Sequence, residues 1–272
     1  MAIFSCKRIL TFATLSRMRI HHIFVYSLLL AGSVFAQDLK PVAERLAAQN
    51  ALFEEQYESD LRNSPERATS YGDYRYNDKL AEYSLAAIAL RNEANRAFLA
   101  RLQAIPTTSF SDQDQLSHDL LIRVLQQRIA DFDLKEFEMP VNQHNGVHTA
   151  LADLPLSVPF DSVKHYEDYI ARLRQIPRVL SQTTEVLRAG LKDNLMPVRF
   201  LLEKLPVQCQ GIMDANPFLT PTKKYPKEIS LEEQKRLTQE ITTAIEKDVF
   251  PAYKAFAAFL SAEYAPHGRT AL

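Results

Sequence analysis

The scarcity of glycine, set against long stretches of regularly spaced apolar residues, most limits the folds open to this chain. Its 272 residues include only six glycines, and stretches rich in Ala, Leu, Glu, Gln and Arg separate them. Apolar residues recur there at intervals of three and four, as on the buried face of an amphipathic helix. The sequence therefore predicts an all-α fold, an array of long amphipathic antiparallel helices with extended loops and at most a minor strand near 132–139.

Serine and proline positions predict where several of these helices begin or end. Ser84, Ser111 and Ser230 each precede an apolar-periodic stretch, and a serine hydroxyl can accept a hydrogen bond from a free N–H of the first turn. Pro177 lacks an N–H and is expected to bend or end the helix that starts near Asp161.

The faces expected to be buried follow from the same spacing. They are Val42, Leu46, Phe53, Tyr57 and Leu61; Ile88, Leu99, Leu102 and Ile105; Leu116, Leu120, Val124 and Ile129; Val163, Tyr166, Ile170 and Leu173; Leu237, Ile241, Ile245 and Val249; and Tyr253, Phe256, Leu260 and Tyr264. Loops are predicted at 64–82, 131–160 and 214–229.

A basic residue followed by a short apolar run predicts a signal peptide. Arg19 precedes the almost wholly apolar residues 23–35, and the stretch ending at Ala36 offers the small residues that signal peptidase prefers. The run is shorter than the roughly 20 residues that cross a bilayer as a helix, and no cysteine follows it to carry a lipid anchor. We therefore expect residues 1–36 to be an upstream extension plus a signal peptide. Residues 37–272 would then form the helical domain, in the periplasm or secreted, with the true start codon at Met1 or Met18 left open.

Charge and cysteine content argue against several kinds of partner. Cleavage near Ala36 removes four basic residues and no acidic one, which leaves 28 of the 32 basic residues beside all 33 acidic ones. This mildly acidic composition lacks the basic footprint of a nucleic-acid-binding protein. Cys209 would be the sole cysteine, so it can form neither an internal disulfide nor a thiolate zinc site, and it is expected to be a small buried residue.

Two histidines, His144 and His148, have the spacing of the zinc-binding H-E-x-x-H motif, but their context differs. Such a pair binds one metal ion only where a helix stacks both side chains on one face. Pro140 lies upstream, Asn145-Gly146 favours a tight turn, and Asn145 occupies the place of the catalytic glutamate. We therefore predict no metal site and no catalytic residue here, but a polar, hydrogen-bonded loop packed onto helices.

Four stretches resemble landmarks of one bacterial family. They are SPERATSYGDYRYNDKL (64–80), MPVNQHNGVH (139–148), YEDYIARL (166–173) and FPAYKAFAAFLSAEYAPHGR (250–269). With them the chain resembles the exported family called domain of unknown function 885. That resemblance implies a longer helical protein grouped with zinc metallopeptidases, whose C-terminal half carries an H-E-x-x-P-G-H-type helix. No residue of this chain matches that motif, and the segment from His144 to His148 coincides with a different, N-terminal landmark.

The resemblance leads to two hypotheses about function. In the first, the chain is a truncated N-terminal portion of an exported zinc-metallopeptidase-like protein, which forms part of a peptide-binding cleft and is inactive alone. In the alternative, it is a free-standing periplasmic helical binding or interaction module without catalytic activity. Whether the chain is itself an enzyme stays open. The candidate cleft residues lie in the family landmarks and are Arg75, Tyr76, Asn142, Gln143 and His148.

The same hypotheses set expectations for cofactors and partners. Zinc is implied for the full-length family, but no cofactor is expected in this chain. A peptide substrate, a separately encoded C-terminal half or self-association are the expected partners, whereas nucleic acid and a stable membrane anchor are not. Because a missing half would leave apolar helix faces uncovered, the loop aromatics near Tyr74 and the terminal stripe are expected to be exposed. That stripe comprises Tyr253, Phe256, Phe259, Leu260 and Tyr264.

Overall fold

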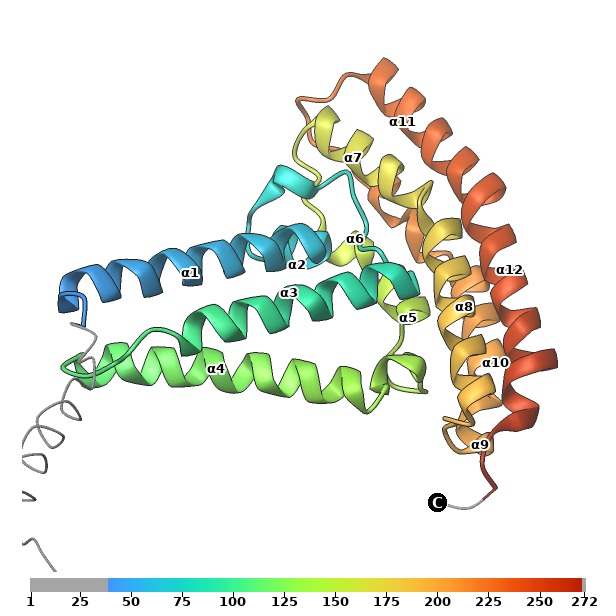
Figure 1. The fold of residues 1–272 in the computed structure, drawn as a ribbon. Coiled ribbons are helices and arrows are strands. Elements are labelled where there is room, and N and C mark those ends of the chain that lie inside the picture. The colour runs from blue at the N-terminus through green and yellow to red at the C-terminus, as the bar shows by residue number, and fades with distance from the viewer. Residues whose placement is uncertain (1–38, 271–272) are drawn as a thin grey trace, which may run out of the picture. The chain divides into compact units, whose positions relative to one another are not determined.

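The computed structural model describes residues 39–270, and most of their backbone is helical (Figure 1). The predicted signal peptide at 1–36 lies outside the described residues. Contacts within the chain separate residues 1–40 from a second unit, 41–272, and everything below concerns that second unit. Within the described part, the sole extended pairing is one isolated bridge between Val198 and Arg269. The all-α prediction is confirmed.

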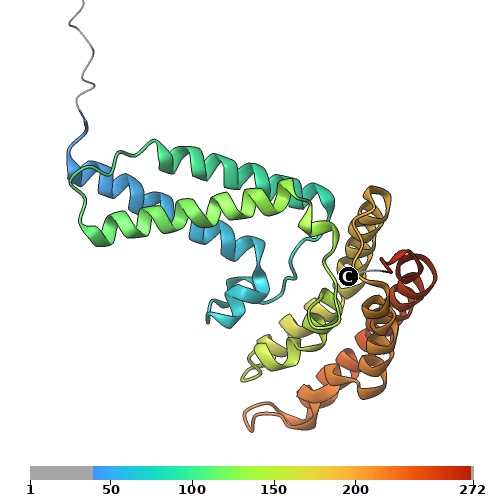
Figure 2. The ribbon, with the colours of Figure 1, turned by 90° about the horizontal axis from the view of Figure 1, so that it is seen from below.

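Three long helices form what we call the three-helix layer. These are α1 (Val42–Asn63), α3 (Leu85–Gln103) and α4 (Asp112–Asp133), which lie side by side in both views (Figures 1 and 2). Its interior is small and partly polar, because the apolar residues Leu52, Leu61, Leu102, Leu125 and Ile129 are buried there together with Gln49, Gln56, Asn92 and His118.

The main hydrophobic core lies among five other helices. They are α7 (Val163–Leu173), α8 (Ile176–Asp193), α10 (Lys204–Ala215), α11 (Leu231–Ala244) and α12 (Phe250–Phe259). Helix α12 packs against both α8 and α10, and α11 packs against α7. The large aromatic side chains that are fully buried are Tyr166, Tyr169, Tyr253, Tyr264, Phe218 and Phe256. Aromatic residues bury the most apolar area per residue, so these helices are the better stabilised part.

Short helices occupy the segments predicted to be loops. They are α2 (Pro65–Ser70), η1 (Tyr74–Tyr76), η2 (Glu136–Glu138), α5 (Val147–Ala152), α6 (Leu154–Ser157) and η3 (Pro217–Lys223). Two more, α9 (Arg199–Leu202) and η6 (Ala265–His267), lie outside those segments. The sequence allows at most a minor strand near 132–139, and none forms there. Lys135 adopts a left-handed conformation (φ 57°) after α4, and the N–H of Glu138 then bonds the Lys135 carbonyl, which makes a local 3-10 turn.

Two π-helical turns flank α12 and join it to its neighbours. They are η4 (Ile245–Val249) and η5 (Leu260–Tyr264). Pro251 has no N–H to donate to the carbonyl four residues earlier, and the preceding N–H, of Phe250, bonds the carbonyl of Ile245 five residues earlier. Pro266 has the same place after η5, where the preceding N–H, of Ala265, bonds the carbonyl of Leu260. The prolines thus widen the helix locally without ending it.

The predicted helix starts are confirmed at each capping serine. The hydroxyl oxygens of Ser84, Ser111 and Ser230 accept hydrogen bonds from the N–H three residues later, at 3.2 Å in each case. Ser162 caps α7 in the same manner, one residue after the predicted start. Pro177 is the second residue of α8, so it ends one helix and opens the next.

The predicted inward faces of α1 and α4 are wrong in part. Leu116, Leu120 and Val124 are 51%, 52% and 43% exposed, and α4 buries His118, Leu125 and Ile129 instead. On α1, Tyr57 is exposed, whereas Arg45, Gln49 and Gln56 are buried. The reason is that polar side chains bond across the layer: the ring Nε2 of His118 lies 3.1 Å from the carbonyl of Leu102. A count of apolar residues alone cannot detect such contacts.

The terminal stripe was predicted to be exposed but is buried. Tyr253, Phe256, Phe259, Leu260 and Tyr264 are all buried, with at most 6% of any of them exposed. The expectation that this stripe is uncovered is wrong, because α8 and α10 of the same chain cover it. Of the loop aromatics, Tyr71 and Tyr74 are exposed as expected.

Candidate functional site

Arg75 and Tyr76 belong to the 3-10 turn η1 after α2. The Arg75 guanidinium lies 2.6 Å from the carboxylate of Asp73 and 2.8 Å from that of Glu58. These two carboxylates raise the pKa of Arg75 above its usual range. The guanidinium also lies over the ring of Tyr76, 5.5 Å from its centre. The charge of Arg75 is therefore already compensated on the surface of the loop.

A buried arginine that the sequence analysis missed holds this loop in place. Arg172 of α7 is fully buried, and its Nε donates to the carbonyl of Lys79 at 2.8 Å. Its terminal nitrogen donates to the hydroxyl of Thr69 at 2.6 Å and to the carbonyl of Tyr76 at 3.3 Å. Burial lowers the pKa of Arg172, against the opposing effect of nearby carboxylates. The signal was an arginine on the otherwise buried face of the YEDYIARL stretch.

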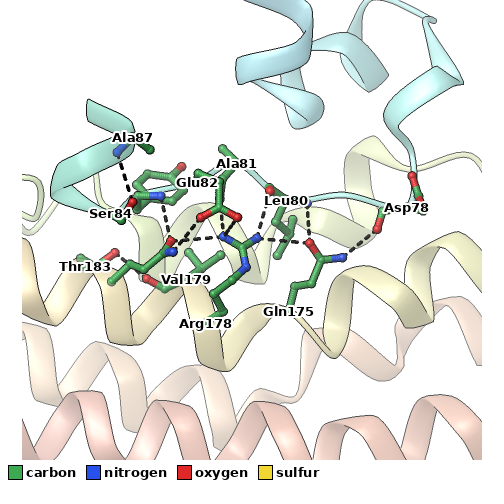
Figure 3. A network of polar contacts seen from close by, with 12 residues as sticks. Asp78, Leu80, Ala81, Glu82, Ser84, Ala87, Gln175, Arg178, Val179 and Thr183 are labelled. Atoms are coloured by element: carbon green, nitrogen blue, oxygen red, sulfur yellow. Dashed lines mark hydrogen bonds and ion pairs between the residues drawn. The ribbon is translucent and has the colours of Figure 1, made fainter. Parts of the chain in front are cut away.

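Helix α8 binds the extended segment 78–84 along its side (Figure 3). Gln175 accepts from the N–H of Leu80 at 3.1 Å and donates to the carbonyl of Asp78 at 2.7 Å. Arg178 donates to the carbonyl of Leu80 at 3.0 Å and pairs with Glu82 at 2.6 Å. Two side chains one turn apart thus form the hydrogen bonds that the N–H and carbonyl groups of an extended segment cannot form with each other. The loop carrying Arg75 and Tyr76 is fixed at both ends.

The second group of candidates lies in the loop 139–148, which leads into α5. The side-chain oxygen of Asn142 accepts from the N–H groups of His144 and Asn145, both at 2.8 Å. Gln208 of α10 donates to the carbonyl of Gln143 at 2.8 Å, so α10 holds the loop. The prediction of a polar, hydrogen-bonded loop that packs onto helices is confirmed, although α5 begins at residue 147.

His148 supports this loop from inside the protein. The side chain is fully buried, and its Nε2 lies 3.1 Å from the side-chain oxygen of Gln208, which requires the proton on Nε2. Burial lowers the pKa of His148, so the ring is neutral at neutral pH. The hydroxyl of Tyr253 donates to the His148 carbonyl at 2.6 Å. Asn142 is exposed and Gln143 half-buried, and His144 and Asn145 are exposed beside them.

The zinc ion implied for the family does not fit the residues described. No group of three His, Cys, Asp or Glu side chains within 39–270 is placed to hold a metal ion. The ring of His144 contacts the side chain of Gln143 on the surface, while that of His148 is buried against Gln208. Cys209 is a free and buried thiol, as predicted, and desolvation raises its pKa to about 12.

The largest hollow described on the chain is a groove between α8 and α12, with a volume of about 720 Å³. Buried rings of Phe256 and Phe259 contribute to its lining, and so do the small side chains of Ser181, Thr184, Ala252, Ala255, Ala258 and Ala262. At one end Arg188 lies 3.3 Å from Glu263 and 5.1 Å above the ring of Phe259. At the other end lie Lys247 and Asp248. The signal missed in the sequence was the three- and four-residue spacing of alanines on α12.

Arg75, Tyr76, Asn142, Gln143 and His148 do not line this groove. Arg172 bonds the carbonyl of Tyr76, whereas Arg75 pairs with Asp73 and Glu58. Gln208 of α10 contacts Gln143 and His148, whereas Asn142 bonds within its own loop. Their role in a substrate cleft stays a prediction.

Comparison with known proteins identifies the family. Residues 65–271 match the family described as "Bacterial protein of unknown function (DUF885)". The chain belongs to the DUF885 family. A solved structure with the same fold is that of the "putative lipoprotein" from Colwellia psychrerythraea, at 16% sequence identity and a TM-score of 0.71. The match covers 85% of the present chain and 43% of the Colwellia chain, so the DUF885 chain spans less than half of that relative's length. No curated protein matches it.

None of the helices between residues 39 and 270 combines the length and the apolar character needed to cross a bilayer.

Proposed function

We propose that this DUF885 chain recognises a peptide in the groove between α8 and α12. In this proposal it forms one wall of a peptide-binding cleft in a zinc-metallopeptidase-like protein, and sequence outside the chain supplies the metal ligands. The observation that carries the proposal is the groove itself, because it is the one hollow described here whose volume suits a peptide. The predicted signal peptide ending near Ala36 supports a place of action in the periplasm or outside the cell.

The lining of the groove fits a short peptide. Its volume of about 720 Å³ lies within the roughly 300–1,000 Å³ of typical ligand pockets. Small residues such as Ala255 and Ala258 let a backbone approach closely, and the rings of Phe256 and Phe259 offer apolar contact. Each end carries both signs of charge, with Arg188 and Glu263 at one end and Lys247 and Asp248 at the other. Peptide termini or charged side chains can therefore find an opposite charge at either end.

A second candidate, the free-standing binding module, is favoured by one specific observation. Tyr253, Phe256 and Tyr264 are buried by helices of the same chain, so the main core is covered without any further part. Both candidates share the groove as a binding site. They differ in whether a catalytic partner acts on what is bound.

The test measures peptide binding and hydrolysis separately. Fluorescent peptides are titrated onto the purified chain and onto the variant Ala258→Phe, whose ring would fill the groove. Ala97→Phe is the matched control, because Ala97 is an equally exposed helix residue of α3 outside the groove. We expect at least a tenfold loss of affinity in Ala258→Phe and none in Ala97→Phe. Equal affinity in both variants would contradict the groove as the binding site.

Hydrolysis distinguishes the two candidates. We expect no peptide cleavage by the chain alone with added zinc. Cleavage that appears when a metal-binding half of a longer DUF885 protein is added, and is lost in Ala258→Phe, supports the first candidate. A chain that binds peptide but neither joins such a half nor gains activity is the free-standing module. Zinc-dependent cleavage by the chain alone would refute both.

A further inference from the structure

A second, smaller cavity lies within the three-helix layer and is unrelated to the groove. Its volume is about 220 Å³, and it is lined from α1, α2, α3 and α4. Nearly all its lining residues are polar, and three of them are the arginines Arg67, Arg91 and Arg128. Asp60 is the one carboxylate among the residues that line it. The lining therefore carries an excess of two positive charges.

The single carboxylate is already paired. Arg128 donates to both oxygens of Asp60, at 2.9 and 2.7 Å, in a two-bond pair. Such a geometry uses the strongest interaction that an arginine makes with a carboxylate. Asp60 is thus committed to Arg128 and bonds neither Arg67 nor Arg91.

Arg91 and Arg67 have no carboxylate bonded to them in the described residues. Arg91 is half-buried and donates to the backbone carbonyl of Glu82 at 2.8 Å. The carboxylate of Glu82 itself bonds Gln182 at 2.7 Å and Arg178 at 2.6 Å. Burial lowers the pKa of Arg91, which shows that its charge is partly desolvated. Arg67 is exposed at the edge of the cavity, and no side-chain contact of its guanidinium is found in the described structure.

Gln56 supplies an independent observation at the same place. This residue of α1 is only 9% exposed and lines the cavity, yet its side-chain amide has no hydrogen-bond partner among the described residues. The amide atoms of Gln56 are not fully buried, so they stay open to a ligand or water. Its NH₂ group is a donor, as are the guanidinium groups around it.

We propose that this cavity binds a small oxyanion, a carboxylate or a phosphate group, between Arg67, Arg91 and Gln56. The planar guanidinium fork matches the oxygens of both anions in geometry and in charge. The volume of about 220 Å³ holds roughly seven waters at about 30 Å³ each, enough for such a group but less than a typical drug-sized ligand needs. The excess positive charge of the lining disfavours a metal cation.

The binding test uses inorganic phosphate and sodium acetate as probes. Each is titrated calorimetrically into the purified chain against sodium chloride of the same ionic strength. We expect one saturating site per chain for at least one probe. Saturation by phosphate alone identifies a phosphate ligand, and saturation by acetate alone identifies a carboxylate. No saturable binding of either probe overturns the proposal.

Variants locate the site. Arg67→Gln removes an exposed guanidinium that has no partner in the fold, so folding is retained, which circular dichroism checks. The control Arg123→Gln removes the same charge from an exposed position on α4 outside the cavity. A charge-assisted hydrogen bond corresponds to at least about tenfold in affinity, so we expect that loss in Arg67→Gln and in Gln56→Leu, and less than about twofold in Arg123→Gln. An equal loss in Arg123→Gln would show that the anion responds only to overall charge, and would reject the site.

Discussion

Two glycines inside helices allow a sharp test of the packing in this structure. Gly190 lies in α8 and Gly211 in α10, and alanine at either position would gain the same intrinsic helix propensity, about 0.8–1.0 kcal/mol. Their surroundings differ. A Cβ atom on Gly211 would meet nothing within 4 Å, whereas one on Gly190 would lie 2.6 Å from the carbonyl oxygen of Glu138 and 3.2 Å from that of Leu195.

The magnitude follows from these distances. Because both contacts at Gly190 are with backbone oxygens, no side-chain rotation can relieve them, and overpacking of this kind costs about 1–3 kcal/mol. The propensity gain is common to both variants and cancels in the comparison. Gly211→Ala should therefore stabilise the chain by up to about 1 kcal/mol. Gly190→Ala should be about 1–3 kcal/mol less stable than Gly211→Ala.

The assay is equilibrium unfolding in urea, followed by circular dichroism for the parent and both variants. The midpoint should shift up for Gly211→Ala, and the two variants should have similar slopes, so that the difference reports stability. If Gly190→Ala unfolds at the same urea concentration as Gly211→Ala, then α8 and η2 do not approach as closely as described.

Three further outcomes follow from the described contacts. Arg172→Met should lose at least about 1–3 kcal/mol of unfolding free energy, because it leaves the carbonyl of Lys79 and the hydroxyl of Thr69 without their buried donor. Exposed Arg123→Met should stay within about 0.5 kcal/mol in the same urea assay. Burial lowers the pKa of His148 in the folded chain. The chain should therefore keep its stability above the unfolded pKa of about 6.5 and lose stability as the pH drops below that value. His148→Gln should flatten this loss, and a pH profile of unfolding that the substitution leaves unchanged would contradict the role of His148. Replacing exposed Leu116 and Leu120 by Gln should reduce binding of a hydrophobic dye and any self-association, while stability stays within about 0.5 kcal/mol.

The sequence alone located the helix starts and the fold class. A serine cap or a helix-breaking proline acts through groups within four residues, so Ser84, Ser230 and Pro177 could be interpreted without knowledge of distant neighbours. The inward face of α11 was also predictable, because it buries a plain apolar stripe. That of α7 was predictable only in part, because it buries Asp168 and Arg172 beside its apolar residues. Membership of the DUF885 family was also predictable, because the family landmarks are short stretches of sequence that need no knowledge of the fold.

The candidate sites depended on long-range contacts and could be predicted only in part. The loops at 64–80 and 139–148 were recognised as landmarks, but their anchors, Arg172 and Gln208, lie roughly 60 to 110 residues away in sequence. The groove between α8 and α12 needs two helices that the sequence does not show to be neighbours. The same holds for the cavity lined by Arg67, Arg91 and Arg128.

Composition and local pattern thus determined that this chain is helical, where its helices begin and to which family it belongs. Tertiary structure alone decided which face each helix buries. Polar residues such as His118 and Gln49 point inward on α4 and α1 because each finds a carbonyl on a neighbouring helix, while Leu120 stays outside. The terminal stripe around Phe256 is buried because α8 and α10 cover it. Whether a side chain is buried depends on which groups lie next to it in the folded chain. A hydrogen bond to such a group can offset the cost of burying a polar side chain, even where the pattern of apolar residues predicts that side chain in solvent.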